Sequence, residues 1–147
     1  MNLSLPPFEY KVQKRNNIVF IYDIIRKKYI VLTPEEWVRQ HVIHYLIDVK
    51  HYPAALIAVE REIELNGLKR RYDIVCYNKL ANPVLIVECK APSITLSQTT
   101  FDQAFEYNTI LNAKYVLITN GIRHLCGTIG EDGKFRLLDE IPEYVRI

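Results

Sequence analysis

Two carboxylates and a lysine near the ends of neighbouring apolar runs are the residues best placed to carry out chemistry. Glu88 and Lys90 end the run from 84 to 90, which is apolar on both alternating faces and is typical of a central strand covered on two sides. Side chains two positions apart on a strand point to the same face, so Glu88 and Lys90 should project together. Burying charged side chains at the end of such a strand costs folding free energy unless they pair with other charges or take part in binding or catalysis.

Asp73 lies in the preceding run, from 72 to 77, and its spacing predicts that it reaches the same point. If the loop from 78 to 83 closes an antiparallel pair, Asp73 lies across from Glu88, give or take one residue. Cross-strand neighbours have Cβ atoms roughly 4.5–5.5 Å apart. Two carboxylates at that separation repel each other by roughly 3–4 kcal/mol at an effective dielectric constant of about 20. We therefore expect that one carboxylate stays protonated or that a cation lies between them.

A hard divalent cation would bring hydrolytic chemistry to this point. Mg²⁺, or Mn²⁺ in its place, is commonly held by one or two carboxylates together with waters and substrate phosphate oxygens. Such an ion polarises a phosphoryl oxygen and lowers the pKa of a bound water. Lys90, about 6–7 Å from Glu88 along the strand, could reach the attacking water or the charge that develops on phosphorus. The alternative is a structural cluster of ion pairs formed by Asp73, Glu88 and Lys90.

The elements that must position these residues are predicted from periodicity and capping signals. Residues 1–16 are expected to form an irregular lead-in, followed by a β-hairpin from 18–22 and 29–32. The segment 33–36, Thr-Pro-Glu-Glu, is a capping box that starts a helix running to about residue 49 or 50. The buried side of that helix is expected to carry Val38, Val42, Tyr45, Leu46 and Val49.

The remaining elements predict the fold class. Strands are expected over 58–65, 71–77, 84–90 and 115–119, a second helix over 97–113, and a C-terminal β-hairpin from 123–129 and 134–138. This order indicates a central mixed sheet flanked by helices, an α/β (α+β) fold.

Composition limits the class of protein. The 147 residues, of which 49% are apolar and 24% charged, are expected to form one globular domain over 1–147. Cys76, Cys89 and Cys126 lack CxxC spacing and indicate buried reduced thiols in a cytoplasmic protein. No signal peptide or membrane span is expected. The net charge is only +2, so any surface that faces nucleic acid must be local.

The basic run Lys69, Arg70 and Arg71 is the best candidate for such a surface, although a solvated strand end would explain it equally well.

The motifs around these residues carry a family resemblance. Asp73, fourteen intervening residues and then Glu88-Cys89-Lys90 resemble the signature of the PD-(D/E)xK nuclease superfamily. Four further segments are TPEEWVRQ at 33–40, KRRYDIV at 69–75, VLIVECKAP at 84–92 and YVLITNG at 115–121. They resemble the N-terminal nuclease-like domain of type I restriction enzyme R subunits, over roughly residues 30–125, with the core motifs inside 33–121.

The resemblance implies a restriction-endonuclease-like fold and roles for the strand residues. Asp73 and Glu88 would be metal ligands, together with the backbone carbonyl of Cys89, and Lys90 would be the catalytic lysine. One departure is Tyr72, which stands where the signature often has proline. A second is that the chain contains no GxxxxGKS/T phosphate loop of a motor domain.

The resemblance also implies supporting residues on the two helices. An acidic residue of the first helix often joins such a site, and here Glu36 is favoured, with Glu35 as the alternative. Gln103 and Tyr107 match the QxxxY motif of R subunits. Because they lie four positions apart on a helix, they could hold a nucleotide or phosphate together, although an ordinary polar stripe would also explain them.

We therefore expect a metal-dependent nuclease domain that hydrolyses nucleic-acid phosphodiesters, DNA being the favoured substrate, in restriction, defence or repair. It would act alone, as a homodimer or in a larger complex, and away from membranes. The alternative is a catalytically silent nucleic-acid-binding or protein-interaction module on the same fold. A third interpretation, an unrelated enzyme with a protonated carboxylate pair, predicts activity in the presence of a chelator. The sequence does not distinguish DNA from RNA as the substrate, or an endonuclease from an exonuclease.

Overall fold

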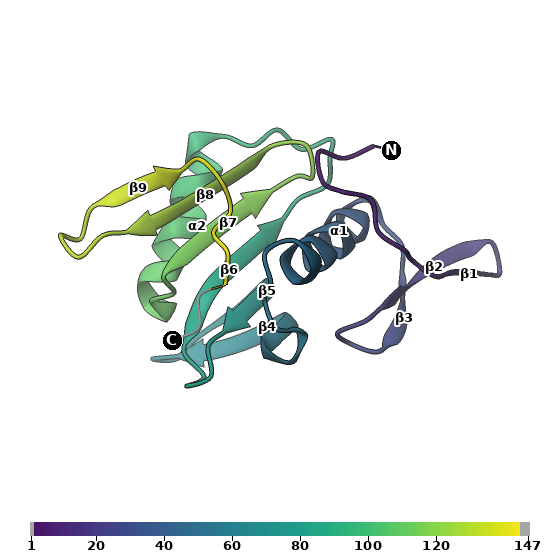
Figure 1. Ribbon diagram of the computed structural model, residues 1–147, viewed down its shortest axis with the longest axis horizontal. Coiled ribbons are helices and arrows are strands. Elements are labelled where there is room, and N and C mark those ends of the chain that lie inside the picture. Colours follow the sequence, from purple (N-terminus) through teal and green to yellow (C-terminus); the bar gives the residue numbers. More distant parts are fainter. Residues whose placement is uncertain (1, 145–147) are drawn as a thin grey trace.

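The computed structural model describes residues 2–144, and within that range it leaves out the side chains at 65, 104, 107–110 and 129. A six-stranded mixed sheet forms the centre of the molecule, in the order β4-β5-β6-β7-β8-β9 (Figure 1). Its strands are β4 (Ile57–Leu65), β5 (Leu68–Tyr77), β6 (Pro83–Cys89), β7 (Tyr115–Thr119), β8 (His124–Ile129) and β9 (Phe135–Leu138). Only β6 and β7 run parallel, and the other neighbours are antiparallel.

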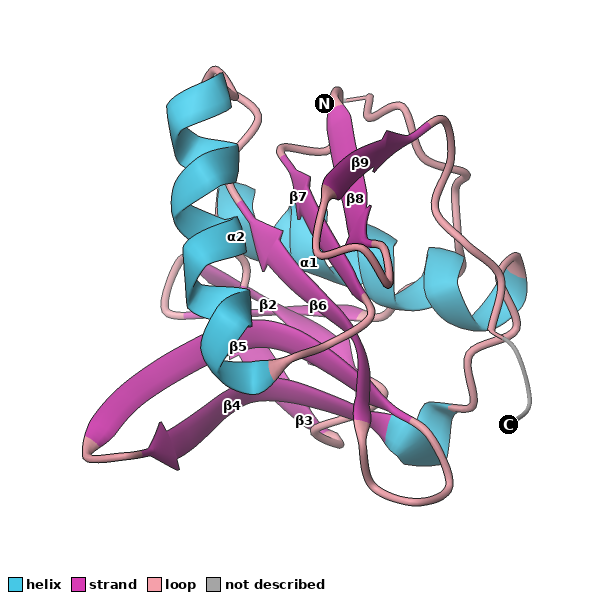
Figure 2. Cartoon of the chain, turned by 90° about the vertical axis from the view of Figure 1, so that its left-hand side faces the viewer, coloured by secondary structure: helices cyan, strands magenta, loops and turns pink. Residues whose placement is uncertain are grey.

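The two long helices cover opposite faces of this sheet. Helix α1 (Pro34–Asp48) packs with Leu117 of β7 in the largest apolar cluster, whereas α2 (Gln98–Leu111) packs with Ile118 through Phe101. Successive residues of a strand point to opposite faces, so the two helices lie on either side of the sheet. Figure 2 shows this arrangement from the side. The expected α+β fold, a mixed sheet flanked by helices, is confirmed.

Helix α1 begins where the capping signal places it. The hydroxyl of Thr33 accepts a hydrogen bond from the backbone N–H of Glu36 at 3.0 Å, and Pro34 opens the first turn. Val38, Val42 and Leu46 are buried as expected. Val49 is 40% exposed, so its assignment to the buried side was wrong: the helix ends at Asp48 and Val49 is its C-cap.

Strand β6 is buried along most of its length, and its pairing with β5 has the expected register. Ile74 lies opposite Val87, and Val75 lies opposite Ile86. The hairpin between β4 and β5 turns at Asn66 and Gly67, which have φ angles of 51° and 80°. A two-residue turn with both residues at positive φ matches the twist of the strands that it joins.

The N-terminal region differs from the prediction. A separate three-stranded antiparallel sheet is built from β1 (Val12–Arg15), β2 (Ile18–Asp23) and β3 (Lys28–Val31). The expected lead-in over 1–16 is therefore wrong for its last residues, because they form β1. The reason is the Asn16-Asn17 pair, which adopts φ angles of 50° and 65° and closes a tight hairpin between β1 and β2. We refer to β1–β3 as the small sheet.

Two further expectations concern thiols and helix length. Cys76, Cys89 and Cys126 are all free and buried, as expected. Neither long helix of the described part of the chain combines the length and the apolar character needed to cross a bilayer.

Candidate active site

A pocket of about 470 Å³ opens where β5 and β6 meet the first turns of α1. It is lined by the three residues expected to be catalytic, Asp73, Glu88 and Lys90. The other charged residues that line it are Glu35, Arg39, Glu60 and the basic run Lys69, Arg70 and Arg71. The structure therefore brings the strand residues of the predicted site together in one pocket.

Asp73 is held at both carboxylate oxygens. Its Oδ1 accepts a hydrogen bond from Arg39 Nη2 at 2.8 Å, and its Oδ2 accepts one from the backbone N–H of Cys89 at 2.7 Å. The latter bond crosses from β5 to β6 just beyond their last paired position, Ile74 with Val87. The N–H of Cys89 is thus used to fix a side chain, and the orientation of Asp73 is set before any ligand binds.

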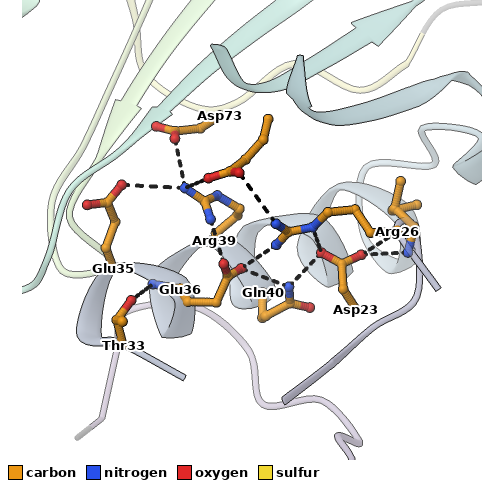
Figure 3. Close-up of polar contacts among 10 residues, drawn as sticks. Asp23, Arg26, Thr33, Glu35, Glu36, Arg39, Gln40 and Asp73 are labelled. Carbon is orange, nitrogen blue, oxygen red and sulfur yellow. Dashed lines mark hydrogen bonds and ion pairs between the residues drawn. The ribbon is translucent and has the colours of Figure 1, made fainter. Parts of the chain in front are cut away.

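Arg39 and Glu60 line the pocket but were missed by the sequence interpretation, and Arg39 has the larger set of contacts. Its side chain is only 6% exposed, and its Nη1 lies 2.6 Å from Glu36 Oε1 (Figure 3). Looser ion pairs of 3.4 Å join its Nη2 to Glu35 and Glu60. Burial alone would lower the pKa of Arg39, but the charges of Glu36 and Asp73 outweigh it and raise that pKa. The guanidinium therefore stays charged.

This contact adds a third solution to the problem of adjacent carboxylates. The sequence interpretation allowed a protonated carboxylate or a bound cation, whereas the structure places a side-chain cation against Asp73. A signal for Arg39 was present, because it lies four residues after Glu35 and three after Glu36 on a predicted helix. Nothing in that spacing showed that it also reaches β5.

Glu88 and Lys90 point to the same side of β6, as predicted. Lys90 Nζ lies 3.0 Å from Glu88 Oε1, and each side chain is about one-third exposed. The hydrogen bond to Glu88 and the nearby charges of Asp73 and Glu35 raise the pKa of Lys90. Lys90 is therefore an ammonium ion at neutral pH.

The first helix presents Glu35 to the pocket, whereas the sequence favoured Glu36. Both oxygens of Glu36 are engaged, by Arg39 at 2.6 Å and by Arg26 and Gln40 at 2.9 and 3.0 Å, and the side chain is 4% exposed. Glu36 is not among the residues that line the pocket. Glu35 is half-exposed and lines it, and partial burial and the charge of Asp73 raise its pKa.

A buried polar network ties this site to the small sheet (Figure 3). Asp23 at the end of β2 is fully buried and accepts hydrogen bonds from Arg26 Nε at 2.8 Å and Gln40 Nε2 at 2.9 Å. Arg26 in turn reaches Glu36. The chain of contacts runs from the small sheet through α1 to Asp73, so the small sheet helps to hold the wall of the pocket.

The basic run of the predicted site lies at the pocket. Lys69, Arg70 and Arg71 are exposed and line the pocket. On β4, Glu64 lies opposite Lys69 and Glu62 lies opposite Arg71, so acidic residues lie across from these two basic side chains.

The two residues of the QxxxY motif were predicted on the second helix. Gln103 is exposed on α2 and is not among the residues that line this pocket. The side chain of Tyr107 lies outside the described residues, so the structure shows only one half of the motif.

The acidic side chains that line the pocket offer oxygen atoms, which are the ligands that a hard divalent cation prefers. Within residues 2–144, and leaving aside the side chains not described, no three His, Cys, Asp or Glu side chains converge on a metal position by themselves. Asp73 and Glu88 would therefore act with a backbone oxygen. The N–H of Lys90 donates to Thr119 of β7, so the Cys89 carbonyl of the same trans peptide points to the other side, toward β5. One or two carboxylates with further neutral oxygens suit Mg²⁺ or Mn²⁺.

Comparison with known proteins identifies the family. Residues 34–142 match the model described as type I restriction enzyme R protein N terminus (HSDR_N). The chain belongs to this family. The match confirms the resemblance drawn from the motifs, and it covers α1, the whole six-stranded sheet and α2.

A solved structure supports the same fold. The chain is similar to a fragment described as an HsdR subunit of a type I restriction enzyme from Vibrio vulnificus YJ016, with a TM-score of 0.56 and 22% sequence identity. The similarity covers 76% of this chain and 24% of that one, so this chain corresponds to about a quarter of the solved fragment. No curated protein shows significant similarity to the chain.

Proposed function

We propose that this domain is a Mg²⁺- or Mn²⁺-dependent nuclease that hydrolyses phosphodiesters of nucleic acid, with DNA as the first substrate to test. The observation that carries the proposal is that Asp73, Glu88 and Lys90 line one pocket, with Glu35 of α1 beside them. Membership of the R-protein family supports a role in restriction. We further propose that the domain works in the cytoplasm, alone, as a homodimer or in a larger restriction complex.

The side chains of the pocket have distinct parts in this proposal. Asp73, Glu88 and the Cys89 carbonyl would hold the ion, with Glu35 in place of Glu36 as the acidic residue from α1. The ion, when bound, would polarise a phosphoryl oxygen and lower the pKa of a coordinated water. Because Arg39 and the Cys89 N–H already fix Asp73, that carboxylate needs little reorganisation on binding.

Lys90 and the basic run would act on the substrate. The side chain of Lys90 is charged and lines the pocket, so it can stabilise negative charge that develops on phosphorus. Lys69, Arg70 and Arg71 line the same pocket and could contact neighbouring phosphates, which would position the strand without reading its sequence.

Cleavage assays with two variants test this proposal. We expect the parent to cut plasmid DNA with Mg²⁺ or Mn²⁺ and to be inactive in EDTA. Lys90→Met and Asp73→Asn should each lower the rate by about 100-fold or more, the usual effect of losing a group that stabilises transition-state charge. The matched control is Lys79→Met, which removes an exposed lysine from the β5–β6 loop. Cleavage in EDTA, or parental rates in both variants, would refute the mechanism, and circular dichroism at the assay temperature shows whether the variants are folded.

One observation favours a second candidate function, a catalytically silent nucleic-acid-binding or protein-interaction module. Arg39 already pairs with Asp73, and Lys90 already pairs with Glu88, so the cluster can exist without a metal. This candidate predicts that no divalent ion supports cleavage, while salt-sensitive binding to nucleic acid or a stable protein partner is retained. Titration with Mn²⁺ by calorimetry separates the two, because the nuclease requires binding that is lost in Asp73→Asn.

A further inference from the structure

The small sheet has an outer face that stays outside the apolar core: Ile18 and Val31 on it are exposed, and its three aromatic rings are partly buried. Ile21 and Asp23 of β2 are fully buried, and Asp23 accepts one of its hydrogen bonds from Gln40 of α1. Alternate residues of a strand point the opposite way, so Phe20 and Tyr22 are directed away from α1. Figure 1 shows the small sheet beside α1, at the edge of the molecule.

Cross-strand pairing adds further side chains to this face. Tyr22 lies opposite Tyr29, and Phe20 lies opposite Val31. Paired residues of an antiparallel sheet share a face. The outer face therefore carries three aromatic rings beside aliphatic and polar neighbours, and its members are Gln13, Arg15, Ile18, Phe20, Tyr22, Tyr29 and Val31.

The aromatic rings contact each other and a cation instead of the core. Tyr22 and Tyr29 meet edge to face with centroids 5.2 Å apart, and the guanidinium of Arg15 lies 4.6 Å above the ring of Phe20. Among the described side chains, the three apolar core clusters include none of these rings. Sheets that present aromatic rings beside basic side chains are suited to stacking unpaired bases.

The charge of the chain is concentrated on the same element. Residues 11–31 contain six Lys or Arg and a single acid, Asp23, and so carry +5, whereas the whole chain carries +2. The rest of the chain is therefore −3. Asp23 is buried and paired, and Arg26 is engaged with it and with Glu36. The other five basic residues are exposed: Lys11, Lys14, Arg15, Lys27 and Lys28.

We propose that the outer face of the small sheet binds single-stranded nucleic acid, with unpaired bases stacked on Phe20, Tyr22 and Tyr29 and with phosphates near the exposed Lys and Arg. Single strands are favoured because the bases of a duplex are already stacked on each other and cannot reach the rings. A docked protein would bury the same apolar side chains, but a net charge of +5 on this element matches a polyanion. This surface is separate from the pocket and does not depend on cleavage.

Binding of a labelled oligo(dT) of about 16 nucleotides, the upper range for a small single-strand-binding fold, tests the proposal. Fluorescence anisotropy is measured in EDTA, so that metal in the pocket contributes nothing. Phe20→Leu and Tyr22→Leu keep an apolar side chain but remove a ring, and each should weaken binding by about 5- to 150-fold. Val12→Ala removes an exposed aliphatic group from the other face of the small sheet and is the matched control, with no expected loss.

The salt dependence tests the electrostatic part. The logarithm of the binding constant should fall with the logarithm of the salt concentration, with a slope of about −0.7 for each phosphate neutralised on a single strand. Lys11 lies opposite Tyr22, and Lys27 lies in the turn between β2 and β3, so Lys11→Gln with Lys27→Gln should reduce the slope by about 1.4. Lys79→Gln with Lys134→Gln, two exposed lysines on other loops, should leave it unchanged.

Three results would overturn the proposal. The first is the absence of measurable binding at low salt, and the second is tighter binding to a duplex of the same length. The third is parental affinity in both aromatic variants, with thermal unfolding by circular dichroism showing that they are folded. Association of the chain with itself through this face, seen by sedimentation without oligonucleotide binding, would assign the face to a protein contact instead.

Discussion

Replacing Arg39 by methionine would remove a buried cation while keeping most of the length of its side chain. The guanidinium is bonded to Glu36 at 2.6 Å and to Asp73 at 2.8 Å, and these carboxylates are 4% and 18% exposed. Removing one partner of a buried ion pair typically costs about 3–5 kcal/mol, because the other charge stays buried and unpaired. Glu36 keeps Arg26 and Gln40, and Asp73 keeps the Cys89 N–H, so we expect about 3 kcal/mol.

Urea denaturation of the parent and of Arg39→Met measures this loss as a difference in the free energy of unfolding. The matched control is Arg136→Met. Arg136 pairs with Asp132 at 2.8 Å, the same distance as Arg39 to Asp73, but the two side chains are 59% and 44% exposed. An exposed pair contributes about 0–1 kcal/mol. The two ion pairs thus have the same N···O distance and differ in how deeply the side chains are buried.

A double-mutant cycle with Asp73→Asn isolates the pair itself. In the Arg39→Met background Asp73→Asn should cost less than in the parent, because the charge that it removes is then unpaired, with a coupling of roughly 0.5–3 kcal/mol. Arg39→Lys, which keeps the charge but loses the forked geometry, should fall between the parent and Arg39→Met. The argument fails if Arg39→Met costs no more than Arg136→Met, or if the two changes are additive.

Three other predictions concern the frame of the site. Thr33→Ala should destabilise the domain by about 1 kcal/mol through loss of the α1 cap, and Thr33→Ser should not; equal unfolding curves for all three proteins would contradict the capping contact. Burial lowers the pKa of His41 below its usual 6.5, so between these two pKa values the unfolded state binds more protons and stability rises with pH. This contribution is present above about pH 6.5 and is lost as the pH falls through the lower pKa of the folded state. Urea denaturation at pH 7 and pH 5 should therefore show a smaller difference in His41→Gln than in the parent, and an identical difference would refute the assignment. Burial raises the pKa of Cys89 well above its usual range and that of Cys126 to about 12, so thiol-specific reagents at pH 8 should label these residues only after unfolding. Rapid labelling of the folded protein would show that they are not buried.

The sequence predicted those parts of the site that depend on a single strand or on one short connection. Glu88 and Lys90 share a side of β6 because strand side chains alternate, and Asp73 reaches β6 because the 78–83 loop sets the register of β5 against it. The capping box predicted the start of α1 for a similarly local reason. The missed strand β1 was also local, since the Asn16-Asn17 turn signal was present in the sequence.

The parts that the sequence left open depend on how one element is turned against another. Neighbouring residues on a helix point about 100° apart, so the rotation of α1 against β5 and β6 decides that Glu35, and not Glu36, lines the pocket. The partner of Asp73 is decided in the same way, because Arg39 lies 34 residues away on α1.

The amino-acid sequence by itself determined the strands of the six-stranded sheet, the two helices and the pairing of β5 with β6. It also determined the presence of two carboxylates and a lysine at one end of that pair. These follow from backbone periodicity and turn chemistry, which act over a few residues. Only the tertiary structure decided which cation neutralises Asp73, which glutamate faces the pocket and which rings of the small sheet stay outside the core. Those outcomes depend on the packing of α1 between two sheets, and that packing is a property of all the buried side chains together.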